Sequence, residues 1–223
     1  GLPATAVGAG HSGGGIAAYA SAGVISPDDA VKLAAVRGAE MAKACAAEST
    51  GMAAVLGGDE AEVLARLDAL ELVPANRNAA GQIVAAGAVT ALEKLAEDPP
   101  ARARVRQLAT AGAFHTHYMA AALAGYAEAA ASITPADPTT TLLSNLDGRP
   151  VTTGADAMDK LVAQLTRPVR WDLCTETMRQ LGTTAIVEFP PAGTLTGIAK
   201  RELRGVATHA VKTPADLDGL TDL

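Results

Sequence analysis

The stretch "GAGHSGGGIAAYASAG", residues 8–23, places a serine between glycines directly before a run of helix-forming residues. A glycine inside a helix costs roughly 1 kcal/mol relative to alanine, so three in a row at residues 13–15 need a reason. Residues 10–14 fit the pattern G-x-S-x-G, in which a tight strand-to-helix turn exposes the serine hydroxyl above a sheet. A flexible glycine loop is the alternative, and the pattern alone does not decide between the two.

The segments on either side of this turn predict a strand followed by two helices. A strand is expected over residues 4–8, and a helix over residues 12–22 is closed by Gly23 in a left-handed cap. The next helix begins with a serine cap, a proline at its first position and two acids in its first turn, over residues 26–29. It is expected to run to about Ala47.

Residues 51–115 predict the order β-α-β-β-α-β, which is the ferredoxin-like pattern. The strands are expected over residues 52–58, 71–78, 81–87 and 105–114, and the helices over 59–70 and 88–98. The rest of the chain predicts a helix over 119–133, a strand over 141–148, two helical stretches and a strand over 184–191, followed by a glycine-bearing turn into "LTGIAKREL". We therefore expect an α/β fold: a hydrolase-like parallel sheet core of residues 1–50 and 116–223, with the serine turn, and an inserted ferredoxin-like subdomain at 51–115.

Composition narrows the class of protein without identifying a function. The length of 223 residues suits one substantial core with a small insertion, and the net charge of −6 argues against a general nucleic-acid binder. No apolar run reaches the ~18 residues of a membrane span. Cys45 and Cys174 lack metal-like spacing, so we expect buried free thiols in a reducing cytoplasm.

A serine nucleophile needs a base within hydrogen-bond reach, and histidine is the usual one. The chain has four histidines: His11, His115, His117 and His209. His11 precedes the serine and is expected to point away from it, while His209 lies in a polar stretch typical of a solvated surface histidine. His115 follows an expected strand and precedes a helix, a loop position typical of catalytic residues. A structural histidine is the other interpretation of His115.

Arg37 is unusual because a helical projection of residues 28–47 places it on the apolar face, with Ala30, Leu33 and Met41. A permanent charge is costly on such a face. Either the guanidinium reaches the rim of the face, or a buried carboxylate pairs with it. Because the helix begins soon after the serine turn, that carboxylate could belong to a substrate held near Ser12.

Several longer blocks occur in one order along the chain: "GHSGG", "SAGVISPDDAVKLAAVRGAEM", "GMAAVLG", "ANRNAAGQIVAAG", "GAFHT", "LLSNLDGRPV", "QLTRPVRW" and "VEFPPAGTLTGIAKR". In these blocks, from Gly8 to about Arg204, the chain resembles the malonyl-CoA:acyl carrier protein transacylase family, the acyltransferases of bacterial fatty acid synthesis. The turn alone is shared with esterases and lipases, whereas the ordered set of blocks is specific.

The resemblance implies a role for each matching residue. Ser12 would be the acylated nucleophile, His115 its base, and Arg37 the residue that grips the malonyl carboxylate. Gln164 matches the glutamine whose main-chain carbonyl orients the histidine ring, and the Gly13 N–H would be one oxyanion donor. In related polyketide acyltransferases, a phenylalanine before the histidine accompanies a preference for malonyl over methylmalonyl groups; here this position is Phe114.

The chain departs from the family at Gly13, where a larger apolar residue is usual, and at Gly15, where an acid is common. It also lacks the "GQGSQ"-type loop of the family's opening segment, whose glutamine lines the oxyanion hole. Acyl-transfer sites normally have a second oxyanion donor from an earlier loop. We therefore expect a further N-terminal segment with such a loop in the native polypeptide.

The predicted function is malonyl transfer from malonyl-CoA to acyl carrier protein, with no metal or redox cofactor because the serine carries the acyl group. We expect a cytoplasmic monomer that binds neither nucleic acid nor membranes. One alternative is a serine esterase or thioesterase of the α/β-hydrolase type, which has the chain order Ser…Asp/Glu…His. Another is a module that binds a carrier protein without catalysis.

Overall fold

Strand β1 (Val7–Ala9) leads directly into the serine turn and helix α1 (Gly14–Ser21). The computed structural model describes residues 6–222, so residues 4 and 5 of the expected first strand lie outside the described residues. Strand β1 pairs in parallel with β6 (Thr141–Leu143), and β6 pairs antiparallel with β7 (Pro150–Val151). The carboxyl ends of β1 and β6 therefore meet at one edge of this sheet.

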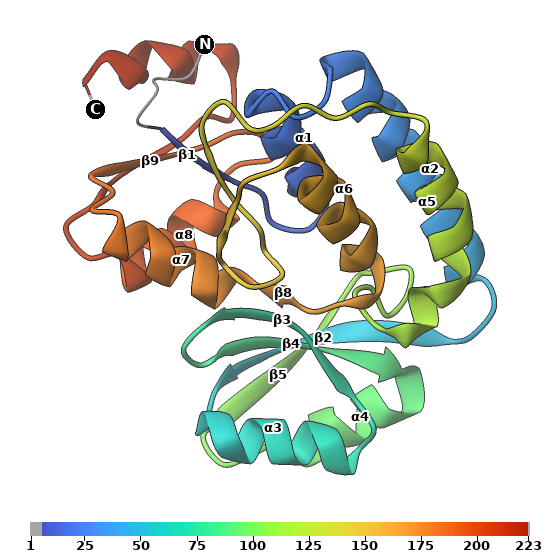
Figure 1. Cartoon of the computed structure of the whole chain (residues 1–223). Helices are drawn as coiled ribbons and strands as arrows, with labels where there is room; N and C mark the ends of the chain where they lie inside the picture. Colours follow the sequence, from blue (N-terminus) through green and yellow to red (C-terminus); the bar gives the residue numbers. More distant parts are fainter. Residues whose placement is uncertain (1–5, 223) are drawn as a thin grey trace. The chain divides into compact units, whose positions relative to one another are not determined.

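The caps of the first two helices agree with the sequence prediction, although α1 begins two residues later than expected and α2 ends two residues earlier. Gly23 has a φ of 80° and closes α1 in the left-handed conformation. Helix α2 (Pro27–Cys45) is capped by Ser26, whose hydroxyl accepts the Asp29 N–H at 3.1 Å. Its buried residues are Ala30, Leu33, Met41 and Ala44. Helices α2 and α5 (Leu123–Ala131) pack side by side in Figure 1 and bury this face.

The order β-α-β-β-α-β is present between residues 50 and 108. Its elements are β2 (Thr50–Gly57), α3 (Glu60–Ala69), β3 (Val73–Ala79), β4 (Gln82–Ala88), α4 (Val89–Glu97) and β5 (Ala103–Leu108). The strands lie in the order β5-β2-β4-β3 with antiparallel pairing, and β8 (Val169–Arg170) adds a fifth strand parallel to β3. Strand β8 was not predicted, and it comes from a part of the chain outside residues 51–115.

Helices α3 and α4 cover one face of this five-stranded sheet (Figure 1). Their buried side chains, Val63, Leu67, Leu92 and Leu95, pack on sheet residues that include Val55 and Ile83. On the other face, Met52, Val84 and Ala86 form a small cluster with Ala113, against which Phe114 packs. The second face of the sheet therefore supports the loop that carries Phe114 and His115.

Strand β5 ends at Leu108, so the prediction that it continues to residue 114 is wrong. Its ladder with β2 stops at the Leu108–Met52 pair. A Cβ on Gly112 would lie 2.6 Å from the Cys45 sulfur, so the chain passes too close to α2 for a side chain there. His115 has a φ of 61°, which is incompatible with a strand. Residues 109–116 therefore form a loop.

The strand expected over residues 141–148 is also shorter, because only β6 is extended. The Gly148 N–H donates to the Ser144 carbonyl at 2.8 Å, and Gly148 has a φ of 70°, so the chain turns into β7. Asn145 consequently lies in a loop at the carboxyl end of β6. The helix expected over residues 119–133 is a 3₁₀ helix, η1 (His117–Ala122), followed by α5.

The remaining elements of the first compact unit are α6 (Gly154–Ala163), η2 (Gln164–Thr166) and the start of α7 (Trp171–Gln180), since the unit ends at Cys174. The second unit contains the parallel pair β9 (Ala185–Glu188) and β10 (Ala207–Ala210), with α8 (Thr194–Glu202) and η3 (Pro214–Asp222). Strand β9 confirms the strand expected over 184–191 but is shorter, whereas β7, α8 and β10 were not predicted. His209 is half-buried, with its Nε2 2.6 Å from the Asp216 carbonyl, so the prediction of a solvated histidine is wrong.

The fold is therefore mixed α/β. None of the helices within residues 6–222 is long and apolar enough to cross a membrane.

Candidate active site

Ser12 lies in the tight turn between β1 and α1, with a φ of 52°. A Cβ on Gly10 would lie 2.2 Å from the Gly14 carbonyl oxygen, so this turn can form only with glycine at position 10. Left-handed backbone at a residue other than glycine is costly and persists where the surroundings impose it. The geometry is that of the tight strand-to-helix turn expected from the G-x-S-x-G pattern and not of a loose glycine loop. Gly13 is exposed at the start of α1, where backbone N–H groups have no intrahelical acceptor.

His115 lies within hydrogen-bond distance of the serine. Its Nε2 is 2.7 Å from the Ser12 Oγ, and its Nδ1 is 2.8 Å from the main-chain carbonyl oxygen of Gln164. Because a carbonyl only accepts, Nδ1 must carry the proton, and the Nε2 lone pair faces the serine hydroxyl. Ser12 and His115 lie 103 positions apart in the sequence, and His115 and Gln164 lie 49 apart. The fold brings all three into hydrogen-bond contact.

The His115 ring is buried, with 2% of the residue exposed. The pKa of His115 is lowered to about 4: burial is the main cause and the charges of Arg37 and His11 act in the same direction, while the hydrogen bond to Gln164 opposes them. The ring is therefore neutral at pH 7 and able to accept a proton from Ser12.

Arg37 projects from α2 toward the same hydroxyl. Its Nη2 lies 3.3 Å from the Ser12 Oγ and 3.3 Å from the side-chain oxygen of Gln164, and its Nε is buried without a hydrogen-bond partner. Within residues 6–222, the structure shows no carboxylate paired with this guanidinium. Burial lowers the pKa of Arg37, so an arriving carboxylate would stabilise its charged form. Of the two alternatives from the sequence, the geometry favours a carboxylate supplied by a ligand.

A cavity of about 280 Å³ opens beside these groups. One wall is α2 and the other is the loop after β5; the lining residues are Ser12, Arg37, Gly38, Met41, Ala42, Cys45, Ala111 and Phe114. Cys45 is only half-buried here, which corrects the prediction of two buried thiols, whereas Cys174 is buried. The Ser12 hydroxyl and the Arg37 guanidinium thus share one cavity with Phe114.

His11 points away from Ser12, as predicted. Its Nε2 lies 2.8 Å from the Asn78 Oδ1, and its ring is 5.5 Å from that of Trp171. Burial lowers the pKa of His11, although its bond to Asn78 raises it. His11 therefore joins the serine turn to β3, and His115 is the histidine whose ring contacts the Ser12 hydroxyl.

The sequence analysis missed two contributions to this site. The side-chain amide of Gln164 bonds both Arg37 and Asn145, and Asn145 donates to the Gly10 carbonyl at 2.7 Å. Asn145 stands in the quoted block "LLSNLDGRPV", but it was not identified as a site residue because a strand was expected to continue through residue 148. A shorter strand would have placed it at the carboxyl end of β6, where functional residues of α/β sheets gather.

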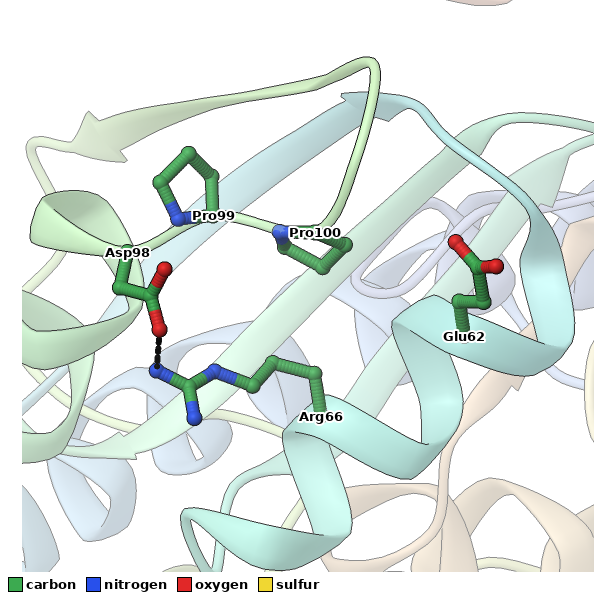
Figure 2. A pocket seen from close by; sticks show the side chains of 5 residues that line it. All are labelled: Glu62, Arg66, Asp98, Pro99 and Pro100. Atoms are coloured by element: carbon green, nitrogen blue, oxygen red, sulfur yellow. Dashed lines mark hydrogen bonds and ion pairs between the residues drawn. The ribbon is translucent and has the colours of Figure 1, made fainter.

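A second hollow, of about 250 Å³, is remote from this chemistry. Figure 2 shows it between α3 and the connection from α4 to β5, lined by Glu62, Arg66, Asp98, Pro99 and Pro100. Arg66 is already paired with Asp98 at 2.8 Å. The hollow holds none of the residues predicted for the site.

Comparison with known proteins agrees with this geometry. The family model "Acyl transferase domain" matches residues 1–216. The chain is 77% identical over 219 residues to the malonyl CoA-acyl carrier protein transacylase of Mycolicibacterium smegmatis, with 96% of this chain and 76% of the relative covered. The crystal structure of MCAT from Mycobacterium tuberculosis matches with a TM-score of 0.93 and 76% identity, over 95% of this chain and 70% of that one.

A further solved structure is a type II PKS acyl-carrier protein in complex with its malonyl-transacylase. It matches with a TM-score of 0.92 and 27% identity, covering 100% of this chain and 73% of that one. The ordered blocks, the serine turn and these matches agree: the chain belongs to the acyl transferase domain family, and within it to the malonyl-CoA:acyl carrier protein transacylases.

Proposed function

We propose that this chain transfers the malonyl group from malonyl-CoA to the phosphopantetheine thiol of acyl carrier protein, for fatty acid synthesis. One observation carries the proposal: the Ser12 hydroxyl lies 2.7 Å from the His115 Nε2 and 3.3 Å from the Arg37 Nη2. A neutral base and a cation therefore both lie beside the nucleophilic oxygen of Ser12. The relatives named as malonyl CoA-acyl carrier protein transacylases support the same substrate and partner.

In the first half-reaction, Ser12 becomes acylated. His115 Nε2 takes the hydroxyl proton while Oγ attacks the thioester carbonyl carbon. The Gly13 N–H is suited to stabilise the negative oxygen that develops there, and the Gln164 carbonyl holds the protonated ring in place. When the carbon–sulfur bond breaks, His115 returns the proton to the sulfur of coenzyme A.

In the second half-reaction, the same groups work on the malonyl-serine ester. His115 takes the proton of the phosphopantetheine thiol, whose sulfur attacks the ester carbonyl, and the proton then passes to Ser12 Oγ as it leaves. Because the serine carries the acyl group between the two thiols, we propose that the reaction needs no metal or redox cofactor.

Arg37 gives the reaction its preference for a dicarboxylic acyl group. Its hydrogen bonds to Ser12 and Gln164 are long, at 3.3 Å each, so a substrate carboxylate can replace them with shorter, charge-assisted bonds. Phe114 lines the same cavity, and its ring is suited to crowd a methyl branch on the α-carbon of the acyl group. We therefore assign Arg37 and Phe114 to the choice of acyl group.

We further infer a hydrolase-like parallel core, residues 1–50 and 116–223, with a ferredoxin-like subdomain at 51–115. The strand order β5-β2-β4-β3 and the parallel pairing of β1 with β6 at the serine turn support this division. We propose a cytoplasmic monomer, a location consistent with two free cysteines.

A serine esterase is the alternative from the sequence analysis, and the contact of the His115 ring argues against it. In the α/β-hydrolase triad, a carboxylate orients the histidine; here the Nδ1 partner is the main-chain carbonyl of Gln164. A neutral ester would also leave the Arg37 guanidinium without a counter-charge.

Mass spectrometry after exposure to malonyl-CoA tests the proposal. A malonyl adduct on Ser12 that transfers to holo acyl carrier protein is expected, with Ser12→Ala as the control without an adduct. Hydrolysis of neutral esters faster than malonyl transfer would favour the esterase. Carrier-protein binding without an adduct would favour a non-catalytic module.

A further inference from the structure

A continuous line of side-chain hydrogen bonds joins the backbone of the serine turn to the guanidinium of Arg37. The Asn145 Nδ2 donates to the Gly10 carbonyl at 2.7 Å, and the Gln164 Nε2 donates to the Asn145 Oδ1 at 3.2 Å. The Arg37 Nη2 then donates to the Gln164 Oε1 at 3.3 Å. Asn145 and Gln164 are 5% and 4% exposed, so water cannot readily replace these bonds.

The two ends of this line dictate the orientation of both amides between them. The Gly10 carbonyl can only accept, so Asn145 must turn its NH₂ toward it and its oxygen toward Gln164. Gln164 must then offer its own NH₂ to Asn145, which leaves its oxygen facing Arg37. Because a guanidinium can only donate, this is the arrangement that Arg37 requires. Every donor in this line therefore faces an acceptor.

The fold explains why Asn145 can reach both groups. The parallel pairing of Ala9 with Leu143 brings the residues after β1 and β6 to the same edge. The Arg170 N–H donates to the Asn145 main-chain carbonyl at 2.7 Å and holds the loop. A Cβ on Gly15 would lie 3.3 Å from the Gln164 Nε2, so the absent side chain leaves room for the amide.

We propose that Asn145 is a positioning residue for the recognition of the malonyl carboxylate: acting through the Gln164 amide, it holds the Arg37 guanidinium beside Ser12. This inference rests on the proposed function. The line of amides does not include the His115 ring, whose Nδ1 bonds the main-chain carbonyl of Gln164 instead. Loss of the Asn145 side chain should therefore weaken selection of the carboxylate and spare proton transfer.

The first test is Asn145→Ala, measured by the rates of Ser12 acylation with malonyl-CoA and with acetyl-CoA. The malonyl-to-acetyl ratio of kcat/KM is expected to fall about three- to tenfold, the effect of one net hydrogen bond, mainly through a higher KM for malonyl-CoA. The rate with acetyl-CoA should change less than twofold. Ser144→Ala is the matched control, because this buried neighbour bonds the Leu146 N–H and takes no part in the line.

A second variant, Gln164→Leu, removes the amide and keeps the main-chain carbonyl that serves His115. It should lower the ratio at least as much, and adding Asn145→Ala should then cause no further fall. An unchanged ratio in Asn145→Ala, an equal loss with both substrates, or a further fall in the double variant would overturn the inference. Wild-type protein that shows no preference for malonyl-CoA would instead overturn the proposed function. If Asn145→Ala does not fold, Gln164→Leu decides: an unchanged ratio refutes the inference.

Discussion

The burial of His115 predicts that acylation of Ser12 remains active well below the pH at which an exposed histidine gains a proton. The free ring has a pKa near 6.5, whereas burial lowers the pKa of His115 to about 4 in the folded chain. Since only the neutral ring can take the serine proton, the acid limb of kcat/KM should be centred near pH 4. At pH 5.5, acylation should therefore keep most of its rate at pH 7.

The same shift makes folding stability depend on pH, with a definite sign. Above pH 6.5, His115 is neutral in both the folded and the unfolded chain and contributes nothing. As the pH falls from 6.5 toward 4, the unfolded chain gains a proton that the folded chain does not bind, so the free energy of unfolding decreases. The decrease amounts to about 2 kcal/mol at pH 5 and about 3 kcal/mol once both states are protonated. Burial of His11 acts in the same direction.

Two measurements check this reasoning. Stopped-flow acylation by malonyl-CoA between pH 4 and 8 gives the acid limb of kcat/KM. Urea unfolding at pH 7 and pH 5, compared between the wild type and His115→Asn, gives the share of this ring in the pH dependence of stability. An acid limb centred near pH 6.5, or the same loss of stability on acidification in both proteins, would show that His115 is not held neutral by burial.

Three substitutions test the acyl-group pocket and the serine turn. Arg37→Ala should lower malonyl transfer at least tenfold more than acetyl transfer, because charge-assisted hydrogen bonds contribute roughly 1.5–3 kcal/mol each; equal losses in steady-state rates with both donors would contradict this role. Phe114→Ser should raise the relative rate with methylmalonyl-CoA by up to about 100-fold, since a methyl contributes ~1–3 kcal/mol of discrimination; an unchanged ratio in a competition assay would refute the steric argument. Gly10→Ala should destabilise the fold by about 1–3 kcal/mol and abolish the Ser12 adduct, because its Cβ would lie 2.2 Å from the Gly14 carbonyl. Gly14→Ala, where no atom lies within 4 Å of the added Cβ, is its control in thermal unfolding, and equal melting temperatures would contradict the prediction.

Local chemistry made much of the fold readable from the sequence. The serine cap and proline of α2, the left-handed Gly23 and the glycines around Ser12 each specify a backbone conformation within a few residues. The β-α-β-β-α-β order follows in the same way, because alternation and helical periodicity are local signals. Ser12, His115 and Arg37 could be named because each stands in a quoted block or on an unexpected face.

The ends of several strands and the hydrogen-bond partners of the site residues depend on long-range packing, which local sequence signals do not specify. Strand β8 has only two residues and exists because β3 offers it an edge, and β5 stops early because Gly112 must pass close to Cys45. The bonds that join Asn145 to Gly10 and Gln164 to Arg37 span 135 and 127 residues. The first depends on the parallel register of β1 with β6, and the second on the packing of α2 near the end of α6. Local sequence patterns specify neither, because these partners are set only when distant elements are brought together.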